Sequence, residues 1–328
     1  MSGIGDIAGL AGLALAALAI DLVAGDPAAV WRRLPHPVVL IGRAIGRLDA
    51  ALNRDGAPEG TRIAAGGLVV MVVVGVAALS GWAVAEAGRA IGGPLGFALL
   101  ALVASTLVAA RGLHDHVAHV GHALGRGLGP GREAVSHIVG RDPARLDEGG
   151  ISRAAIESAA ENFSDGVTAP LFWLLVAGLP GLAAYKAVNT LDSMIGHRTA
   201  RHHAFGRVAA RLDDLANLIP ARATGLLFVG AAALGRTADG ARALRVMARD
   251  ARHHRSPNAG WPEAAMAGAL GLRLAGPRVY PGHTVEDRWI GDGTPEATAA
   301  DIRRALALYR RATGVLATLL LAIIVLAG

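Results

Sequence analysis

The strongest constraint on the fold is a set of long apolar stretches that carry few or no charges. A helix needs about 20 mostly apolar residues to cross a bilayer, and four stretches of this chain approach that length. They are Ile7–Ile20 with its continuation to Gly25, Ile63–Ala85, Pro94–Ala110 and Ala312–Gly328. No basic region precedes the first stretch, so we interpret it as a retained helix rather than a cleaved signal peptide. The pattern predicts an integral membrane protein.

The composition agrees with this interpretation. Hydrophobic residues make up 53% of the 328 residues and charged residues 18%, whereas soluble domains contain about 25% charged residues. The absence of cysteine excludes a disulfide scaffold and any thiolate metal ligand or nucleophile. The net charge of +6 comes almost entirely from arginine, because Lys186 is the only lysine. The basic residues are not interleaved with aromatic ones, so nucleic acid is not an expected partner.

Two further apolar stretches are short or interrupted. Pro170 and Pro180 are expected to break Gly166–Tyr185 into pieces too short to span, and Ala223–Gly235 is marginal in length. Either stretch can be a re-entrant hairpin or a helix buried among others, where protein covers its backbone. We therefore expect an all-α, polytopic membrane protein with re-entrant or buried helices and amphipathic cytoplasmic helices, in a single domain over residues 1–328.

The distribution of arginine predicts which segments face the cytoplasm. Cytoplasmic loops carry an excess of basic residues, and arginine is dense in four polar segments between the apolar helices. These segments are Gly25–Arg62, Arg111–Asp165, Lys186–Arg222 and Arg236–Arg311. We expect them on the cytoplasmic side of the membrane, with the short link Gly88–Gly93 outside. Four basic segments on one side do not fit a full crossing by every apolar stretch, so the sequence leaves the number of crossings open.

The richest polar constellation lies just before an apolar stretch. Glu157, Glu161 and Asp165 are four residues apart and would line one face of a helix. Like charges at this spacing repel one another, and a bound cation would offset the repulsion. Such oxygen ligands suit Mg²⁺, which also takes substrate phosphates as ligands. We interpret the three acids as candidate catalytic residues and metal ligands, and Asn162 as a candidate substrate-binding residue. The alternative is a solvated acidic face balanced by Arg153.

A second cluster combines an acid with polar neighbours. Asn189, Asp192 and Ser193 would share one helix face, and Gly196 permits a helix end or a close approach. Asp192 is a candidate catalytic residue and metal ligand, with Asn189 and Ser193 as substrate-binding candidates. Arg198 follows as a candidate phosphate ligand.

A third cluster stands some twenty residues further along. Asp213 and Asp214 are candidate metal ligands in a helix that Pro220 is expected to close. Arg211 and Arg222 are candidate phosphate ligands, because a guanidinium group matches the geometry of phosphate oxygens. Taken alone, each cluster could be a helix cap or ordinary surface. Three of them on one flank of the membrane together suggest a site for metal and phosphate.

Further candidates lie in turn-rich segments. Ser256, Asn258 and Trp261 precede a helix of small residues and are candidate substrate-binding residues, although an ordinary N-cap loop explains the segment equally well. Asp26 and His36 stand in a proline-rich exit from the first helix. His36 is a candidate substrate-binding residue, and the alternative for both is helix capping.

Several familiar chemistries are not indicated. The histidines at 114, 116, 119 and 122 have spacings that can bind Zn²⁺ or Ni²⁺ on a helix, but a titrating helix face is the better interpretation. No Walker motif precedes Lys186. No Gly-x-Ser-x-Gly elbow is present.

The order of these motifs resembles the CobD/CbiB family of cobalamin biosynthesis, the adenosylcobinamide-phosphate synthases, over nearly the whole chain. The motifs that carry the resemblance are Asp21–Pro27, Pro35–Val38 with Ile41-Gly42, Ile138–Asp142, Glu157-Ser158 with Glu161-Asn162 and Asp165-Gly166, Asn189–Met194, Arg211–Asp214 with Ile219–Arg222, and Ser256–Ala264. Two departures are small: Pro143 stands where the family often has threonine, and the histidines between His114 and His122 are not a family hallmark.

The resemblance implies an ATP-dependent ligase. It would join adenosylcobyric acid in amide linkage to (R)-1-amino-2-propanol or its O-phosphate, with Mg²⁺ as cofactor and ATP as co-substrate. On this hypothesis the acids bind Mg²⁺, the arginines hold phosphate, and an acid outside the metal shell accepts the ammonium proton. The implied partners are the corrinoid, the lipid bilayer and possible further membrane-bound enzymes of the pathway. The sequence leaves a homo-oligomer open.

Two other functions are compatible with the residues. A membrane transferase would use the acids to bind a diphosphate substrate through Mg²⁺, but its usual aspartate motifs are missing. A corrinoid or ion transporter would use them as a coupling site, but the chain contains no visible inverted halves. The three functions differ in what the activity requires: a corrinoid with an amine for the ligase, a polyprenyl diphosphate for the transferase, or an ion gradient for the transporter.

Overall fold

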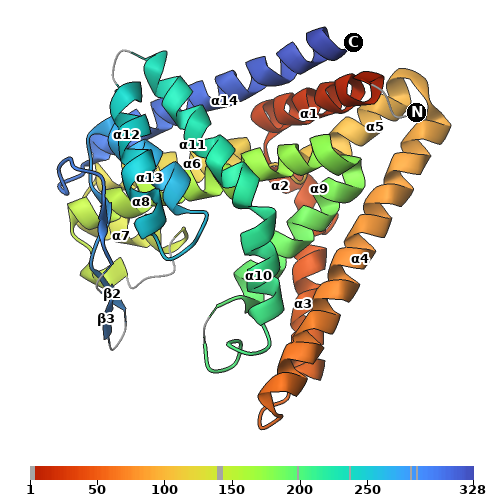
Figure 1. Cartoon of the computed structure of the whole chain (residues 1–328), viewed down its shortest axis with the longest axis horizontal. Coiled ribbons are helices and arrows are strands. Elements are labelled where there is room, and N and C mark those ends of the chain that lie inside the picture. Colours follow the sequence, from red (N-terminus) through yellow and green to blue (C-terminus); the bar gives the residue numbers. More distant parts are fainter. Residues whose placement is uncertain (1–3, 139–142, 198, 236–237, 281–282, 286) are drawn as a thin grey trace. The chain divides into compact units, whose positions relative to one another are not determined.

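The structure is a computed structural model that describes residues 4–138, 143–197, 199–235, 238–280, 283–285 and 287–328. Helices dominate it, which confirms the predicted fold class (Figure 1). The chain divides into two compact units, which are described separately. Unit 1 comprises Met1–Ala109, Ala169–Asn217 and Leu320–Gly328, and unit 2 comprises Ala110–Thr168 and Leu218–Leu319.

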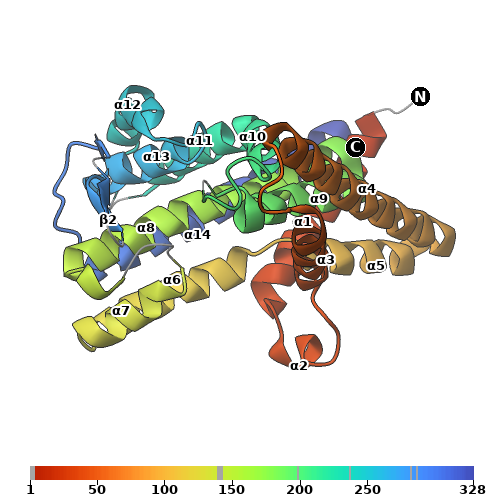
Figure 2. The same ribbon diagram turned by 90° about the horizontal axis from the view of Figure 1, so that it is seen from below.

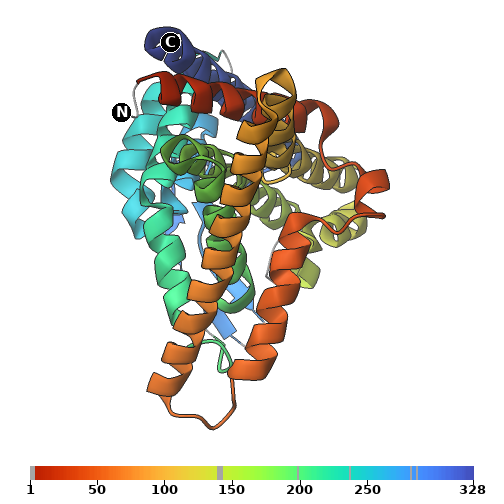
Figure 3. The same ribbon diagram turned by 90° about the vertical axis from the view of Figure 1, so that its right-hand side faces the viewer.

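Unit 1 is built around the long helix α4. Its helices are α1 (Ile4–Ala24), α2 (Ala28–Trp31), α3 (Pro37–Leu52), α4 (Glu59–Ile91), α5 (Gly93–Ser105), α9 (Ala169–Ile195) and α10 (Arg207–Ala216). Helix α4 returns alongside α3 to form a hairpin (Figure 3). Helix α9 packs against both, and α10 packs against α4 and α9. The core contains the buried side chains of Ile45, Val73, Leu191 and Phe205. The core therefore fixes the ends of α9 and α10 beside each other.

Among its described residues, unit 2 contains the remaining helices and four short strands. The helices are α6 (Ala110–Leu124), α7 (Leu128–Ser136), α8 (Glu148–Phe163), α11 (Leu218–Ala233), α12 (Gly240–Asp250), α13 (Gly260–Leu270) and most of α14 (Ala299–Ala327), with short turns η1 (Pro143–Arg145), η2 (Ser164–Thr168) and η3 (Ala251–His253). Helices α11, α12 and α13 pack side by side (Figure 2). The Tyr309 ring meets Phe163 edge-on with centroids 4.7 Å apart, and its hydroxyl donates to the Ala110 carbonyl at 2.8 Å.

The strands form two small antiparallel pairs in unit 2, β1 (Leu274–Ala275) with β4 (Trp289–Ile290) and β2 (Arg278–Tyr280) with β3 (His283–Val285). Strands of two or three residues are too short to give a detectable alternation, so the sequence did not predict them.

Within the part of the chain that the structure describes, five helical segments are long and apolar enough to cross a membrane, so the chain is a multi-pass membrane protein. They are Ile7–Ala24, Glu59–Ile91, Gly93–Leu124, Glu148–Ile195 and Ala299–Ala327. Helices α10 and α11 meet this criterion only together and are bent by 46° at their junction. The uncertain stretch from Ala223 lies in α11 of this bent pair.

Two predictions about proline are wrong. Pro170 does not interrupt its stretch, because it lies in the first turn of α9, where a missing N–H costs no hydrogen bond. Pro220 does not close a helix but occupies the same kind of position in α11, after α10 has ended at Ala216. The predicted break near Pro180 is confirmed, since Gly178 takes a positive φ of 62° inside α9.

Candidate functional site

The six predicted acids fall in different units. Asp192, Asp213 and Asp214 belong to unit 1, and Glu157, Glu161 and Asp165 belong to unit 2. Each group is described within its own unit.

In unit 1 the end of α9 and helix α10 bring three aspartates together. Asp192 and Asp214 are both close enough to Asp213 to repel its charge. Asp192 is in the last turn of α9, and the other two are in the second half of α10. The second and third clusters of the sequence therefore meet in space.

Asp213 is held by amide side chains rather than by cations. Its Oδ2 accepts a hydrogen bond from Asn217 Nδ2 at 3.1 Å, and Asn189 also donates to its carboxylate. The Asn217 Oδ1 in turn accepts from the buried Tyr185 hydroxyl at 2.9 Å. The other carboxylate oxygen, Asp213 Oδ1, is buried and has no hydrogen-bond partner among the described residues. An oriented carboxylate with one open oxygen is a suitable ligand for a cation.

Asp192 lies against a glycine. A Cβ on Gly196 would overlap Asp192 Oδ1 and crowd the Asp192 carbonyl, so only glycine leaves room for the carboxylate here. His197 is close enough to attract the charge of the Asp192 carboxylate, and the Asp214 carboxylate is close enough to repel it. No arginine or lysine among the described residues forms an ion pair with Asp192 or Asp213.

The other candidates around this cluster differ in their surroundings. Ser193 is exposed, and its hydroxyl donates to the Asn189 carbonyl at 2.8 Å, which leaves its oxygen able to accept. Arg211 is exposed on α10 and forms no ion pair with any described residue. Arg198 lies outside the described residues.

His36 caps a helix, which was the alternative considered for it. Its Nδ1 accepts from the Val38 N–H at 3.2 Å and caps α3, and its Nε2 lies 3.6 Å from Asp26 Oδ1. The hydrogen bond from His36 holds the pKa of Asp26 below its usual range. The positive charge of Lys186 also lowers the pKa of Asp26, by a smaller amount. Both ring nitrogens of His36 are thus engaged within the protein.

In unit 2 Glu157 connects α8 to strand β1. The side chain is buried, and its Oε1 accepts a hydrogen bond from the Ala275 N–H at 2.8 Å. Ala275 has a positive φ of 58°, which is uncommon for a residue with a side chain. Glu157 therefore stabilises an unusual backbone conformation at the strand.

Glu161 and Asp165 do not continue the environment of Glu157. Glu161 is exposed near the end of α8, whereas Asp165 is half-buried in the π-helical turn η2. A π-turn inserts extra backbone into the helix, so the four-residue spacing no longer keeps Asp165 on the face of Glu161. Asn162 Nδ2 donates to the Ser158 carbonyl at 2.9 Å and to its hydroxyl at 3.0 Å.

Arg222 and Trp261 meet in unit 2. The Arg222 guanidinium lies 4.6 Å from the centre of the Trp261 ring, and it donates to the Leu218 carbonyl at 2.6 Å. The Trp261 indole N–H donates to the Pro257 carbonyl at 3.2 Å. Arg252 is near enough to repel the charge of Arg222. Two neighbouring guanidinium groups beside an aromatic ring favour a bound anion.

The segment from His254 to Glu263 is held by its own side chains. Ser256 Oγ accepts from the N–H groups of Asn258 and Ala259, both at 3.2 Å, and His254 Nδ1 accepts from the Ser256 N–H at 3.0 Å. His254 Nε2 lies 3.7 Å from Glu263 Oε1, and Glu263 is buried. Ser256 acts here as a cap, and Asn258 is buried behind it.

Comparisons with known proteins agree with the motifs. The family model described as CobD/Cbib protein matches residues 14–309. The chain belongs to the CobD/CbiB family. It is 52% identical over 303 residues to "Cobalamin biosynthesis protein CobD" of Rhodobacter capsulatus, covering 92% of this chain and 93% of the relative. It is also 51% identical over 310 residues to a protein of the same name from a Sinorhizobium species, covering 94% and 96% of the two chains. No solved structure matches this chain. The predicted family resemblance is confirmed.

The described carboxylates of this CobD/CbiB protein do not form a Mg²⁺ site made of protein ligands alone, but they fit a site that substrate phosphate and water complete. Within the described ranges, no three acidic or histidine side chains lie close enough to bind one metal ion together, and this includes the histidines of α6. Mg²⁺ is usually bound by one or two carboxylates with substrate phosphates and water completing its shell. The open oxygen of Asp213, with Asp192 and Asp214 beside it, fits this binding by one or two carboxylates.

Sequence reasoning missed several polar residues of this family member. Lys186 stands near Asp26, and its signal was that it is the only lysine of the chain. Arg252 beside Arg222 had no signal, because it is one of many arginines. Glu263 was visible within a motif, but its burial against His254 was not.

Proposed function

We propose that this CobD/CbiB family member acts in cobalamin biosynthesis as an amide-forming ligase. It would join adenosylcobyric acid to (R)-1-amino-2-propanol or its O-phosphate at the expense of ATP, giving adenosylcobinamide or its phosphate. The names of the relatives support the pathway. The observation that carries the reaction class is the aspartate cluster of unit 1, where the buried Asp213 Oδ1 lacks a hydrogen-bond partner among the described residues.

The proposed reaction has two balanced steps. A carboxylate oxygen of the corrinoid attacks the γ-phosphorus of ATP, and ADP leaves with the electrons of the broken phosphorus–oxygen bond. The neutral amine then attacks the acyl carbon of the resulting acyl phosphate. Inorganic phosphate leaves and takes up the proton that the nitrogen loses as the amide forms. Mg²⁺, when bound, would screen the phosphate charge that builds up in the first step.

The residues of the chain would bind and orient the reactants. Asp213, with one of its neighbours Asp192 and Asp214, would hold Mg²⁺ and the phosphates it carries, while the amide of Asn189 keeps Asp213 in place. An aspartate outside the metal shell would take the proton of the ammonium group, because only the free amine is a nucleophile. Arg211 is exposed on the same helix and would contact phosphate.

Unit 2 offers further candidates for the same reaction. Arg222 and Arg252 would bind a phosphate group, with Trp261 fixing the Arg222 guanidinium. Glu161 and Asp165 are candidates for a second metal ion or for the proton acceptor. They are proposed separately from the unit 1 cluster.

The proposed setting is a bacterial inner membrane with the site facing the cytoplasm, where ATP is available. Arginine-rich segments between the apolar helices support this orientation. Membrane-bound enzymes of later steps are proposed partners, and assembly with further copies of the chain would be compatible with the same site.

A coupling assay tests the proposal. Purified protein in detergent is incubated with adenosylcobyric acid, aminopropanol phosphate or aminopropanol, ATP and Mg²⁺, and the products are measured by mass spectrometry. We expect an amide product that requires both ATP and Mg²⁺. Folded protein that forms no product with either amine would contradict the ligase, and corrinoid uptake into proteoliposomes would then support a transporter.

Alanine substitutions connect the reaction to the acids. Asp192→Ala and Glu161→Ala are each expected to abolish turnover while the protein still inserts and folds. Wild-type turnover in either variant would remove that residue from the proposed machinery.

A further inference from the structure

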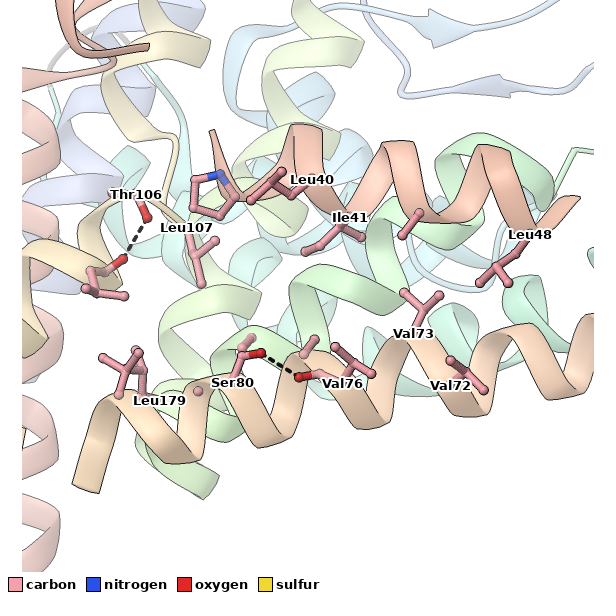
Figure 4. A pocket seen from close by; sticks show the side chains of 17 residues that line it. Leu40, Ile41, Leu48, Val72, Val73, Val76, Ser80, Thr106, Leu107 and Leu179 are labelled. Carbon is pink, nitrogen blue, oxygen red and sulfur yellow. Dashed lines mark hydrogen bonds between the residues drawn. The ribbon is translucent and has the colours of Figure 1, made fainter. Parts of the chain in front are cut away.

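An apolar cavity lies within unit 1, between the α3–α4 hairpin, the end of α5 and the middle of α9. Its volume is about 490 Å³, which is in the usual range for sites that bind small ligands. Figure 4 shows Leu40, Ile41 and Leu48 of α3 facing Val73 and Val76 of α4 across it. Helices α4, α5 and α9 all belong to candidate membrane spans.

The cavity lining offers no available hydroxyl donor. Its two hydroxyl groups are Ser80, which donates to the Val76 carbonyl, and Thr106, which donates to the Val103 carbonyl, both at 2.8 Å (Figure 4). Both bonds stay within the helix of the donor. A nucleotide or a corrinoid with many amide groups would lose its own hydrogen bonds with water here and gain few in return. A hydrocarbon chain loses none.

The cavity is open along the side between α3 and α4. Leu40 and Val76 line it and are nevertheless 50% and 59% exposed. Helix geometry places Arg47 beside the cavity-facing positions of α3, on the side opposite to the buried Ile45. Arg43 lies one helical turn before Arg47. Both arginines are exposed and form no ion pair with any described residue. An apolar groove bordered by such arginines complements a lipid with an acidic headgroup.

We propose that this cavity binds one acyl chain of an anionic phospholipid, whose phosphate contacts Arg43 and Arg47. The site is independent of the proposed ligase reaction, because none of its residues belongs to the aspartate cluster. It would tie the α3–α4 hairpin, and with it the core that positions α9 and α10, to the surrounding bilayer.

Native mass spectrometry in a mild detergent tests the proposal. The full chain is titrated with palmitoyl-oleoyl phosphatidylglycerol and, separately, with the phosphatidylcholine of the same chains. We expect one phosphatidylglycerol to remain bound under conditions that remove phosphatidylcholine. Ala44 lines the cavity and is exposed, so Ala44→Trp should fill the groove and abolish this binding. Ala50→Trp is the matched control, because Ala50 is exposed on the same helix outside the cavity lining.

The headgroup contact has its own pair of variants. Arg47→Gln should weaken phosphatidylglycerol binding about fivefold, the contribution expected of one arginine near an anionic lipid. Arg54→Gln removes the same charge beyond the end of α3 and should leave binding unchanged. Equal binding by the two tryptophan variants would overturn the proposal. So would release of the lipid by adenosylcobyric acid mole for mole, which would assign the cavity to substrate.

Discussion

Asp250 and Glu157 of unit 2 differ from Asp213 of unit 1 in how their carboxylates are satisfied. In unit 2, Asp250 receives two hydrogen bonds from Arg249, at 2.6 and 2.7 Å, and one from the Gly291 N–H at 2.9 Å. Glu157 receives one from the Ala275 N–H. In unit 1, Asp213 is held by amides and surrounded by carboxylates, and one of its oxygens is open.

This difference separates carboxylates that stabilise the fold from those that are free to bind a ligand. A buried charge paired with an arginine or a backbone N–H recovers part of its desolvation cost inside the protein. Two carboxylates close to a third recover nothing from one another and are expected to lower stability until a cation arrives. The contrast predicts opposite results for substitutions in the two units.

Among the substitutions that test this contrast, the largest effect is expected at Asp213. Asp213→Asn should lower turnover in the coupling assay by at least about 100-fold, because a neutral amide is a poor metal ligand. Its midpoint of thermal unfolding in detergent should stay the same or rise, since the substitution removes charge repulsion. A variant that loses activity and stability together would place Asp213 with the structural carboxylates and break the comparison.

A smaller loss of activity is expected when Asp192 is displaced rather than removed. Gly196→Ala would push the Asp192 carboxylate out of position, and a shift of about 1 Å can lower the rate by about 100-fold. The kcat of the variant is compared with that of Gly46→Ala, in which the new methyl group meets open space. Equal kcat values would show that the position of Asp192 is unimportant.

At Glu157 we expect an effect on stability. Glu157→Ala leaves the Ala275 N–H without its acceptor and should cost about 1–3 kcal/mol. Glu157→Gln keeps an oxygen acceptor and should remain close to wild type in both unfolding midpoint and turnover. If Glu157→Gln folds normally but is inactive, Glu157 belongs to the catalytic machinery as the sequence suggested.

The sequence predicted the fold and part of the candidate site. Apolar length predicted the helical membrane fold, because hydrophobicity and helix length are local properties. The pairing of residues 189–193 with 211–217 was suggested by their shared composition of acids and amides. Local spacing failed at Asp165, because the π-turn that changes the register leaves no pattern in the sequence.

Long-range contacts were beyond prediction from one sequence. Glu157 is 118 positions from its backbone partner, Ala275, and nothing in either segment indicates the contact. The same holds for the link from Asp250 to Gly291. For this reason the sequence suggested that Glu157, Glu161 and Asp165 bind metal together, although Glu157 accepts a hydrogen bond from strand β1.

The smallest effect expected is the pH dependence of stability at Asp250. The hydrogen bond from Arg249 holds the pKa of Asp250 below the usual range of aspartate. A carboxyl with a lowered pKa in the folded state contributes its full stabilisation above the pKa of the unfolded chain, about pH 4, and loses it as the pH falls further. Because Arg249 is half exposed, we expect the contribution to be about 1 kcal/mol or less. Unfolding midpoints measured from pH 6 to pH 3 should therefore fall more steeply for wild type than for Asp250→Asn. Parallel curves would show that the Arg249–Asp250 pair adds nothing to stability, and the difference between Asp250 and Asp213 would then depend on the backbone hydrogen bond from Gly291 alone.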